Sequence, residues 1–496
     1  MKIDFKEYKE VWKYLFWFIL LIVACRFTKG IAAAGVTLFA IWAIAKKRPG
    51  VVMLCYMVLP MLIQVNGTLR GGSALFGMIC RISPVILTVL VLGESAQRQG
   101  RNILPLGGLY PYCLVALISS VGGWCPPVSY LKLVNFLAFL IGLHVGMKNL
   151  HDYPEELRVL RTGLLAFAVF IILGSIATYP FPSLGYSMFI NNMSMWTEID
   201  DAAEFIREYS GIKLFSGVTN HSQTLAPVTV ACVAWTLLDM LFIEKKSSWL
   251  HMSLIGASPI LLFMTRSRIG LLGLVATLTI VYLFALPKAS VDIAVRRKVR
   301  GLFMGFIMLC MVGAVIAEIK DNSITKWLRK TENIEESEEK GDLLETVTKS
   351  RQGVIAENMY DFNKNPLLGM GFQTSEFHRY AYQAGRITWY SAPIEKGLLP
   401  LMVLGETGVV GGIVFAIFVL MFYAGCKRKR YLCTSLLMTV FFVLNMAESS
   451  YFSPGGLGGV LWVVLVGGGF VIDMVMLGED KMADAMAMEF DGFYKM

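Results

Sequence analysis

Residues 249–286 read WLHMSLIGASPILLFMTRSRIGLLGLVATLTIVYLFAL. Two long apolar segments, about 249–265 and 268–286, meet there at a polar seam that carries Arg266 and Arg268. An apolar run of this length crosses a bilayer core of about 30 Å as an α-helix. Arginine costs about 2.5–3.5 kcal/mol at the centre of the hydrocarbon, so a pair at the membrane edge predicts a functional site. Guanidinium groups indicate that its ligand is an anion.

The whole chain has the composition of a polytopic membrane protein. Of its 496 residues, 56% are hydrophobic and 16% are charged, and the mean hydropathy is +0.60. These values are too apolar for a soluble globular chain. We predict an all-α bundle of about fourteen transmembrane helices, from the apolar runs long enough to span a bilayer. Their approximate spans are 12–26, 30–45, 50–66, 74–94, 106–122, 129–147, 162–180, 220–243, 249–265, 268–286, 301–318, 398–425, 431–447 and 456–477.

The distribution of Lys and Arg predicts the orientation of the bundle, because basic residues of short loops stay on the cytoplasmic side. With the N-terminus inside, every predicted cytoplasmic loop carries a basic cluster, whereas the outer loop 122–128 carries none. The clusters are Lys46–Arg48, Arg98 with Arg101, Arg158 with Arg161, Lys245–Lys246, Arg296–Lys298 and Lys427–Arg430. An even number of spans returns the C-terminus to the cytoplasm, and the first helix lacks a cleavage site. The seam with Arg266 and Arg268 then faces outward.

The positive charges serve topology, so the net charge of +9 gives no reason to expect a nucleic-acid partner. The nine cysteines form neither a disulfide framework nor a CxxC pair. Asp200 and Asp201 lack a third ligand at suitable spacing, so we predict no metal site and no cofactor.

The spans divide the chain into six regions. We predict an N-terminal transmembrane bundle over 1–180, an outer loop over 181–219, and transmembrane helices with the TRSR seam over 220–318. A long outer loop over 319–397, C-terminal transmembrane helices over 398–477 and a cytoplasmic tail over 478–496 follow.

Both outer loops contain segments with the pattern of an interfacial helix. In the long loop, a charge run (TENIEESEEKGD) typical of a solvated face precedes LLETVTKSRQGVIAENMY. Helical periodicity places Leu344, Val347, Arg351 and Val354 on one side. A charge on an apolar face either snorkels at the membrane surface or points into an anion pocket.

Four motifs resemble the bacterial O-antigen ligase and polymerase superfamily. They are FSGVTNHSQTLA (215–226), TRSRIGLLGL (265–274), SRQGVIAENMYDFNKNPLLGMGF (350–372) and LLPLMVLGETGVVGG (398–412). The resemblance covers about residues 210–455, and the last two motifs bracket the long outer loop. Glycine-rich helix packing is the alternative explanation for GLLGL and GETGVVGG, and NPLLGMGF specifies a turn in either case.

The resemblance implies a glycosyltransferase of the bacterial cytoplasmic membrane, inverting and metal-independent, whose donor is a glycan on a polyprenyl diphosphate. As the glycosidic bond breaks, the diphosphate gains negative charge at the outer leaflet. Arginine binds phosphate oxygens through two parallel donors and stays ionised in a poorly hydrated site. We therefore expect Arg266, Arg268 and Arg351 to bind the diphosphate, with Lys396 as a further contact.

The reaction also needs a base, because a neutral sugar hydroxyl is a poor nucleophile. Ligases of the superfamily carry a His-Asn pair about nine residues before the ExG glutamate, which here is Glu406. The corresponding positions are Gly397 and Leu398, so the pattern is absent. His378 and Glu395 are the candidate bases. His221, Glu406 and Glu448 are further candidates for contact with donor or acceptor.

We predict an enzyme that polymerises lipid-linked repeat units, because the His-Asn signature is missing. Its partners are a polyprenyl-diphosphate-linked glycan donor, a glycan or lipid acceptor and membrane lipids. Transfer to lipid A core by a ligase is the alternative. A transporter of lipid-linked glycans is the second alternative, although such proteins often show internal repeats, and the first half of the chain has no counterpart of the TRSR segment.

Overall fold

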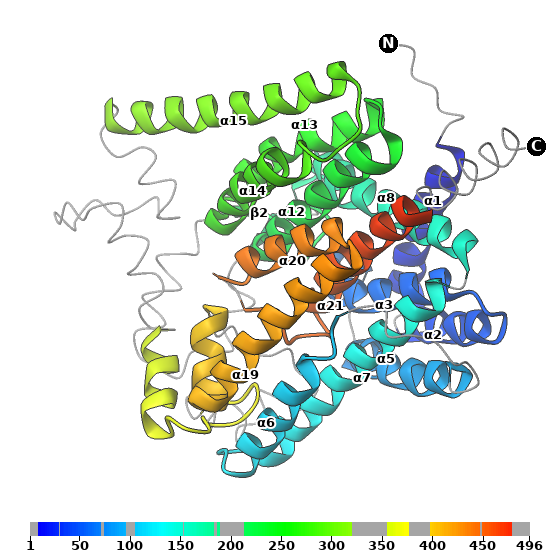
Figure 1. The fold of residues 1–496 in the computed structure, drawn as a ribbon. Coiled ribbons are helices and arrows are strands. Elements are labelled where there is room, and N and C mark those ends of the chain that lie inside the picture. Colours follow the sequence, from blue (N-terminus) through cyan, green and yellow to red (C-terminus); the bar gives the residue numbers. More distant parts are fainter. Residues whose placement is uncertain are drawn as a thin grey trace, which may run out of the picture.

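The computed structural model describes residues 8–28, 30–70, 74–95, 105–151, 153–182, 186–188, 213–319, 355–375, 397–446 and 449–478. Within these residues nearly every segment is helical, and the helices pack side by side along their length (Figure 1). One antiparallel pair of three-residue strands, β1 (Tyr186–Met188) and β2 (Lys213–Phe215), is the exception. The predicted all-α class is confirmed.

The N-terminal half contributes a first group of helices. They are α1 (Lys9–Thr28), α2 (Gly30–Ala45), α3 (Pro49–Gln64), α4 (Gly67–Arg70), α5 (Ala74–Ser95), α6 (Leu109–Val121), α7 (Pro126–His151) and α8 (Pro154–Ala177).

The C-terminal half contributes α12 (Ser222–Asp239), α13 (Trp249–Met264), α14 (Arg268–Ile280), α15 (Ile293–Ile319), a helix over 355–364, α19 (Leu399–Lys429), α20 (Leu432–Leu444) and α21 (Leu457–Leu461). Three of these continue as π-helical turns, η1 (Met240–Glu244), η2 (Val281–Ala285) and η4 (Trp462–Gly467).

Every predicted span coincides with one of these helices. Among the described residues, eight helices are long and apolar enough to cross a membrane: Lys9–Thr28, Phe76–Gly93, Pro126–His151, Pro154–Ala177, Ser222–Glu244, Arg268–Ala285, Leu399–Lys429 and Leu457–Gly478. The shorter apolar helices are α2, α3, α6, α13 and α20. The membrane class is thereby confirmed, while the number of fourteen crossings stays a prediction.

Several helices extend beyond the apolar runs that predicted them. α8 begins at Pro154 instead of 162, and α15 begins at Ile293 instead of 301. Proline at the first helical position and acidic residues in the first turn, Glu155 and Glu156, favour the earlier start of α8. Polar residues can occupy these turns because they lie at the end of the bundle, where Arg48 Nε donates to Glu156 Oε1 at 2.9 Å.

The bundle has two chemically different ends. We call one the basic end, because the connections there carry Lys46–Arg48, Lys245–Lys246 and Lys427–Arg430. Tyr8 donates to Ser248 Oγ at 2.5 Å at this end, which ties α1 to α13. The opposite end, the loop end, holds residues 65–66, 122–125, 265–267 and 445–456 and both strands. The two ends alternate along the chain as the predicted topology requires.

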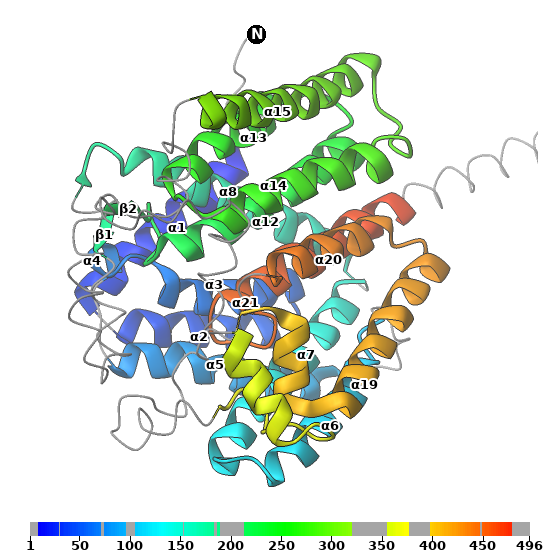
Figure 2. The ribbon, with the colours of Figure 1, turned by 90° about the vertical axis from the view of Figure 1, so that its left-hand side faces the viewer.

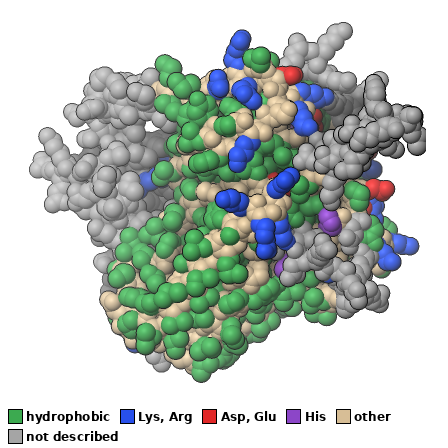
Figure 3. Space-filling model, viewed as in Figure 1, with side chains coloured by type: hydrophobic (Ala, Val, Ile, Leu, Met, Phe, Trp, Pro, Cys, Tyr) green, Lys and Arg blue, Asp and Glu red, His purple; other side chains and the backbone are tan. Residues whose placement is uncertain are grey.

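Burial follows the position of each helix in the bundle. α12 is enclosed by α8, α13, α14 and α20, and nearly all of its side chains are buried. Peripheral helices instead expose apolar side chains, such as Leu117 and Val121 on α6 and Ile413 and Leu420 on α19. Figure 3 shows an almost continuous hydrophobic surface over the lower part of one face, with Lys and Arg above it. Such a surface suits contact with lipid.

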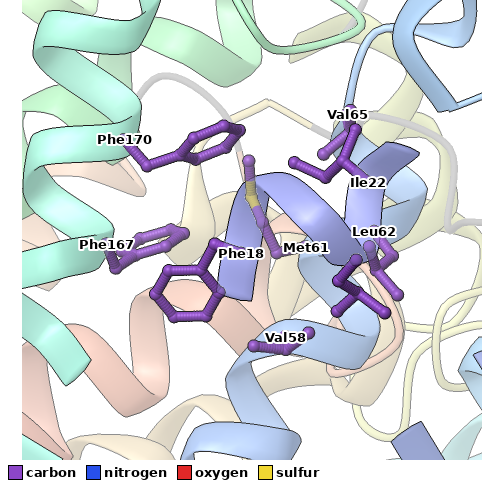
Figure 4. Close-up of a pocket in the computed structure, with 9 residues that line it drawn as sticks. Phe18, Ile22, Val58, Met61, Leu62, Val65, Phe167 and Phe170 are labelled. Atoms are coloured by element: carbon purple, nitrogen blue, oxygen red, sulfur yellow. The ribbon is translucent and has the colours of Figure 1, made fainter. Parts of the chain in front are cut away.

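A small apolar hollow of about 20 Å³ lies between α1, α3 and α8 (Figure 4). Its lining contains only hydrophobic side chains: Phe18, Leu21, Ile22, Val58, Met61, Leu62, Val65, Phe167 and Phe170. The hollow is therefore a small gap in the apolar packing of these three helices.

Candidate functional site

The TRSR segment forms the tight turn between α13 and α14 at the loop end. Thr265 Oγ1 donates to Leu262 O at 2.7 Å and so closes α13, while Ser267 Oγ accepts from Gly270 N at 3.4 Å and begins α14. Arg266 lies between these two caps with φ +50°, a left-handed conformation that is uncommon for a residue with a side chain. Arg268 occupies the first position of α14.

The caps and the arginines differ in exposure. Thr265 and Ser267 are buried, whereas Arg266 and Arg268 are only partly buried. The hydroxyl groups of Thr265 and Ser267 thus face the interior, and the guanidinium groups of Arg266 and Arg268 lie at the edge of the bundle. Local backbone strain of this kind costs about 1–3 kcal/mol and is concentrated at functional sites.

The glycines that follow the turn pack α14 tightly against its neighbours. A Cβ on Gly270 would lie 2.8 Å from the Ala226 Cβ of α12, and one on Gly273 would lie 2.8 Å from Leu444 Cδ2 of α20. Small residues allow such close approach between membrane helices. The GLLGL part of the motif therefore holds the turn in position, as the packing alternative supposed.

A second feature of the loop end is a break in α19. Gly408 has φ +63° and ψ −166°, which is not helical, so the helix is interrupted after its first turns. A break frees backbone groups that need partners inside a membrane. Residues 365–371 supply them: Met370 N donates to Gly405 O at 2.9 Å and Gly371 N to Glu406 O at 3.0 Å, while Val409 N donates to Pro366 O at 2.8 Å. We call this pairing of 365–371 with 405–410 the loop clamp.

Glycine is required at the two crossing points of the loop clamp. A Cβ on Gly369 would lie closer than 3.0 Å to the backbone of Glu406, and one on Gly408 equally close to the backbone of Leu367. Both residues also have positive φ. The turn predicted for NPLLGMGF is therefore present, and its glycines are needed because it docks into the ExG segment of α19. Two of the four motifs interlock here.

Serine side chains of α6 and α7 hold the loop clamp from the other side. Ser119 Oγ donates to Glu406 O at 2.5 Å, and Ser129 Oγ donates to Phe372 O at 2.8 Å. Ser120 Oγ accepts from Phe372 N at 3.3 Å and lies 2.6 Å from Ser129 Oγ. The N-terminal half of the chain thus positions the segment around Phe372, in the later part of the predicted long loop.

Buried polar side chains gather at the first half of α19. Glu406 is 0% exposed, and the helix over 355–364 packs Asn358 against Gly405, where a Cβ would lie 3.1 Å from Asn358 O. Asp361 on the same helix is also 0% exposed. Figure 1 and Figure 2 both show this helix beside the start of α19. A buried carboxylate needs specific partners, so Glu406 contributes to the internal structure of this region.

A layer of buried aromatic rings adjoins the loop clamp. Phe452 stacks on Tyr112 with ring centroids 5.1 Å apart and an interplanar angle of 12°. Phe136 lies edge-on to Phe452 at 5.1 Å and packs against Phe372 at 6.0 Å. Each such pair adds about 0.5–1.5 kcal/mol beyond burial of its area. The layer fixes the segments around 372 and 452 to α6 and α7.

His221 has a structural role in the described chain. It is the N-cap of α12, where its Nδ1 accepts from Gln223 N at 3.0 Å. Nearby, Asn66 N donates to Val218 O at 2.9 Å, which places His221 at the loop end. Because Nδ1 accepts a hydrogen bond, the neutral ring carries its proton on Nε2.

Two further cations lie at the loop end, and neither was among the predicted site residues. Lys132 of α7 is 9% exposed, and its Nζ donates to Gln373 O at 3.2 Å. Arg81 of α5 lies under Gly455, where a Cβ would be 3.1 Å from Arg81 Cγ and 3.5 Å from Asn135 Nδ2. Each of the two is a single charge within an apolar run. A charge inside a membrane span is itself a sign of a functional site, so the sequence did carry a signal for both.

The other five predicted site residues lie outside the described residues. These are Arg351, His378, Glu395, Lys396 and Glu448. The structure therefore places Arg266, Arg268, His221 and Glu406 at one end of the bundle. That Arg351 lies close to Arg266 and Arg268 stays a prediction. In the part of the chain that is described, no group of three or more His, Cys, Asp or Glu side chains is suited to a metal ion.

The fold and this end of the bundle define a polytopic membrane protein with an arginine-bearing turn and an anchored long loop. Residues 251–416, which contain both features, match the family model described as O-antigen ligase. The match confirms the resemblance to the O-antigen ligase-like superfamily and indicates a glycosyltransferase-like enzyme of the ligase or polymerase type. No match was found among curated proteins or among solved structures.

Proposed function

We propose that the protein polymerises polyprenyl-diphosphate-linked oligosaccharide units into a surface polysaccharide. The observation that carries the proposal is the TRSR turn, which presents Arg266 and Arg268 at the loop end inside the matched region. We take the loop end as the outer face of a bacterial cytoplasmic membrane, with both termini inside, because the basic clusters lie at the opposite end. The six regions predicted from the sequence remain our division of the chain.

The proposed chemistry is an inverting substitution at the anomeric carbon of the donor. The acceptor hydroxyl oxygen forms the new glycosidic bond as the bond between the anomeric carbon and the phosphate oxygen breaks. The electron pair of that bond leaves with the polyprenyl diphosphate, and the proton of the hydroxyl passes to a base. No metal is needed if cationic side chains take up the charge of the leaving group.

In this scheme Arg266, Arg268 and Arg351 bind the diphosphate, with Lys396 beside them. Their planar forks match phosphate oxygens, and a fixed donor that meets developing charge contributes about 2.7–4 kcal/mol in other enzymes. His378 or Glu395 takes the proton. His221, Glu406 and Glu448 remain proposed contacts to donor or acceptor. For Glu406 and His221, the burial and the capping bond described above favour an indirect, positioning contribution.

Purified protein and a synthetic lipid-linked repeat unit in detergent test the proposal. Ladders of products that differ by one repeat unit, together with release of polyprenyl diphosphate, are expected. A protein that only transports lipid-linked glycans has no membrane to cross in detergent and yields no product. Absence of any glycan transfer by well-folded wild-type protein contradicts the proposal.

Substitution of the arginines tests the site. Arg268→Lys and Arg351→Lys keep the charge but lose the paired donors, so turnover should fall by about a hundredfold for a loss of 2.7 kcal/mol. Arg428→Lys, an exposed arginine at the basic end, is the matched control and should behave as wild type. Normal turnover in both test variants removes these arginines from the site.

The base is identified by His378→Gln and Glu395→Gln, assayed separately. One of the two should lose turnover while membrane insertion and thermal unfolding stay unchanged. If both remain active, another group activates the acceptor.

The ligase alternative differs in its acceptor and in its cellular consequence. A strain that lacks the protein should accumulate single repeat units on the lipid carrier, as measured by mass spectrometry of lipid-linked glycans. Accumulation of long finished chains on the carrier supports transfer to lipid A core instead.

A further inference from the structure

The inference concerns Arg81 and Lys132, the two cations on α5 and α7 that lie outside the matched region 251–416. α5 and α7 run parallel, and Thr88 Oγ1 donates to Ala138 O at 2.8 Å between them. Arg81 precedes Thr88 by seven residues and Lys132 precedes Ala138 by six, so at 1.5 Å per residue both lie roughly 10 Å further toward the loop end. The two cations thus share one level of the bundle.

Contacts from other segments bring the same residues together. Gly455 lies against both Arg81 and Asn135, and Asn135 follows Lys132 by three residues, on the same face of α7. Gln373, whose carbonyl oxygen accepts from Lys132, donates through Nε2 to Phe452 O. Two loop segments, around 373 and around 455, therefore meet at this cluster of two cations and an amide.

The cluster is set deep in the bundle yet remains partly open. Lys132 lies about 9 Å along α7 from Pro126, and Arg81 lies about 10 Å along α5 from its first residue. Arg81 and Asn135 are partly exposed. The donor of the Asn135 amide, Nδ2, lies 3.5 Å from the position of a Cβ on Gly455, beside Arg81. Cations at such depth are costly, and in membrane proteins they usually mark sites for substrates or ions.

This cluster is separate from the TRSR turn. α13 and α14 pack against α12, whereas α5 and α7 pack against each other and against α3. Figure 1 and Figure 2 both show α12, α20 and α21 between the two groups of helices. One anion cannot bridge helices on opposite sides of these elements, so the two sets of cations have separate ligands.

We propose that Arg81, Lys132 and Asn135 bind the diphosphate of a lipid-linked acceptor glycan. The inference rests on the proposed function: in polymerisation both substrates are polyprenyl-diphosphate-linked glycans, and only the donor's diphosphate leaves. The acceptor's diphosphate stays bonded to its sugar and needs a binding site but no stabilisation of developing charge. A lysine and a single arginine suit that task, because they supply positive charge without several guanidinium groups in a fixed arrangement.

The experiment compares two acceptors in purified protein. One is the lipid-linked repeat unit, and the other is the same oligosaccharide without lipid or phosphate. Arg81→Gln and Lys132→Gln should each raise KM for the lipid-linked acceptor at least tenfold, with little change in kcat, and leave transfer to the phosphate-free acceptor unchanged. Arg268→Lys should reduce transfer to both acceptors. Lys47→Gln, an exposed cation at the basic end, is the matched control.

Lys132→Gln also removes the hydrogen bond to Gln373 O, so Arg81→Gln is the decisive variant and thermal unfolding in detergent is measured for both. Equal losses with both acceptors, or an unchanged KM for the lipid-linked acceptor in Arg81→Gln, overturn the proposal.

A binding measurement separates this proposal from the proposed function. Native mass spectrometry with polyprenyl diphosphate alone should find two bound copies in wild type and one in the Arg81→Gln, Lys132→Gln double variant. A single copy in wild type, or two in the double variant, contradicts the second site whether or not the protein transfers glycans.

Discussion

The guanidinium of Arg161 holds the carboxylate of Asp239 through two hydrogen bonds, at 2.7 Å from Nε to Oδ1 and 2.9 Å from Nη2 to Oδ2. The pair joins α8 to the end of α12, and His251 Nε2 of α13 lies 2.9 Å from the same Oδ2. Asp239 and His251 are both 0% exposed. Arg161 also donates to Glu244 in η1. Three helices are thus fastened at the basic end by one buried network.

Asp239→Leu should destabilise the protein by about 3–5 kcal/mol, because it leaves Arg161 largely buried without its main partner. A lowered thermal unfolding temperature in detergent measures the loss. The double variant Arg161→Met, Asp239→Leu should recover part of it, since the guanidinium is removed together with its main partner, while Glu244 and His251 each lose one contact. Lys298→Gln, which loses one exposed contact to Ser247, is the control. A single Asp239→Leu variant as stable as wild type would show that the network carries little energy.

Gly408→Ala should destabilise the loop clamp by about 3 kcal/mol, from a left-handed φ and from overpacking against Leu367. The same substitution at Gly256 of α13, where a Cβ meets nothing within 4 Å, should be neutral or slightly stabilising. Thermal unfolding of the two variants gives the comparison. Equal behaviour of Gly408→Ala and Gly256→Ala would mean that α19 is not broken at this residue.

Ser129→Ala should cost about 1–3 kcal/mol, because it removes the donor to the buried carbonyl of Phe372. Turnover should fall as well if the segment around Phe372 must be held in place. Ser435→Ala, which loses only a bond within its own helix, to Leu432 O, serves as the reference. The hypothesis fails if Ser129→Ala matches that reference in both stability and turnover.

Arg266→Gly should separate stability from activity. Glycine adopts φ +50° without strain, so the unfolding temperature should stay the same or rise, while turnover is lost with the guanidinium. Lys245 has φ +54° at the basic end, and Lys245→Gly should show the same effect on stability with full turnover. If the Arg266→Gly variant keeps its turnover, the left-handed backbone at this residue serves the fold and the guanidinium has no part in the reaction.

Features that show in the sequence as a regular spacing of apolar residues or as an uneven distribution of charge were predictable. Apolar runs located the apolar helices that the structure describes, and the basic clusters at 46–48, 245–246 and 427–430 lie at one end of the bundle. The TRSR seam was predictable for a related reason: paired charges at the end of an apolar run stand out against their surroundings. The match over 251–416 confirms the resemblance that four motifs had suggested.

Features that depend on partners distant in sequence were not predictable. Glycine-rich stretches such as GETGVVGG occur in packed helices and in broken ones, and only the hydrogen bonds from 365–371 distinguish the two. Arg161 was interpreted as a topological anchor, since its partner Asp239 lies 78 positions away. Arg81 and Lys132 were hidden because a single charge barely changes the mean hydropathy of a long apolar window.

The predicted long loop over 319–397 is held by main-chain bonds at two places near its end: residues 365–371 by the loop clamp, and Leu399 just after it by its N donating to Asn445 O at 3.0 Å. Insertions or exchanges between these two points therefore transmit little disturbance to the scaffold, because closing a longer segment costs only slowly more entropy. Exchange of residues 376–396 alone is therefore a direct test, on the proposed function, of whether this interval sets the preference for a glycan.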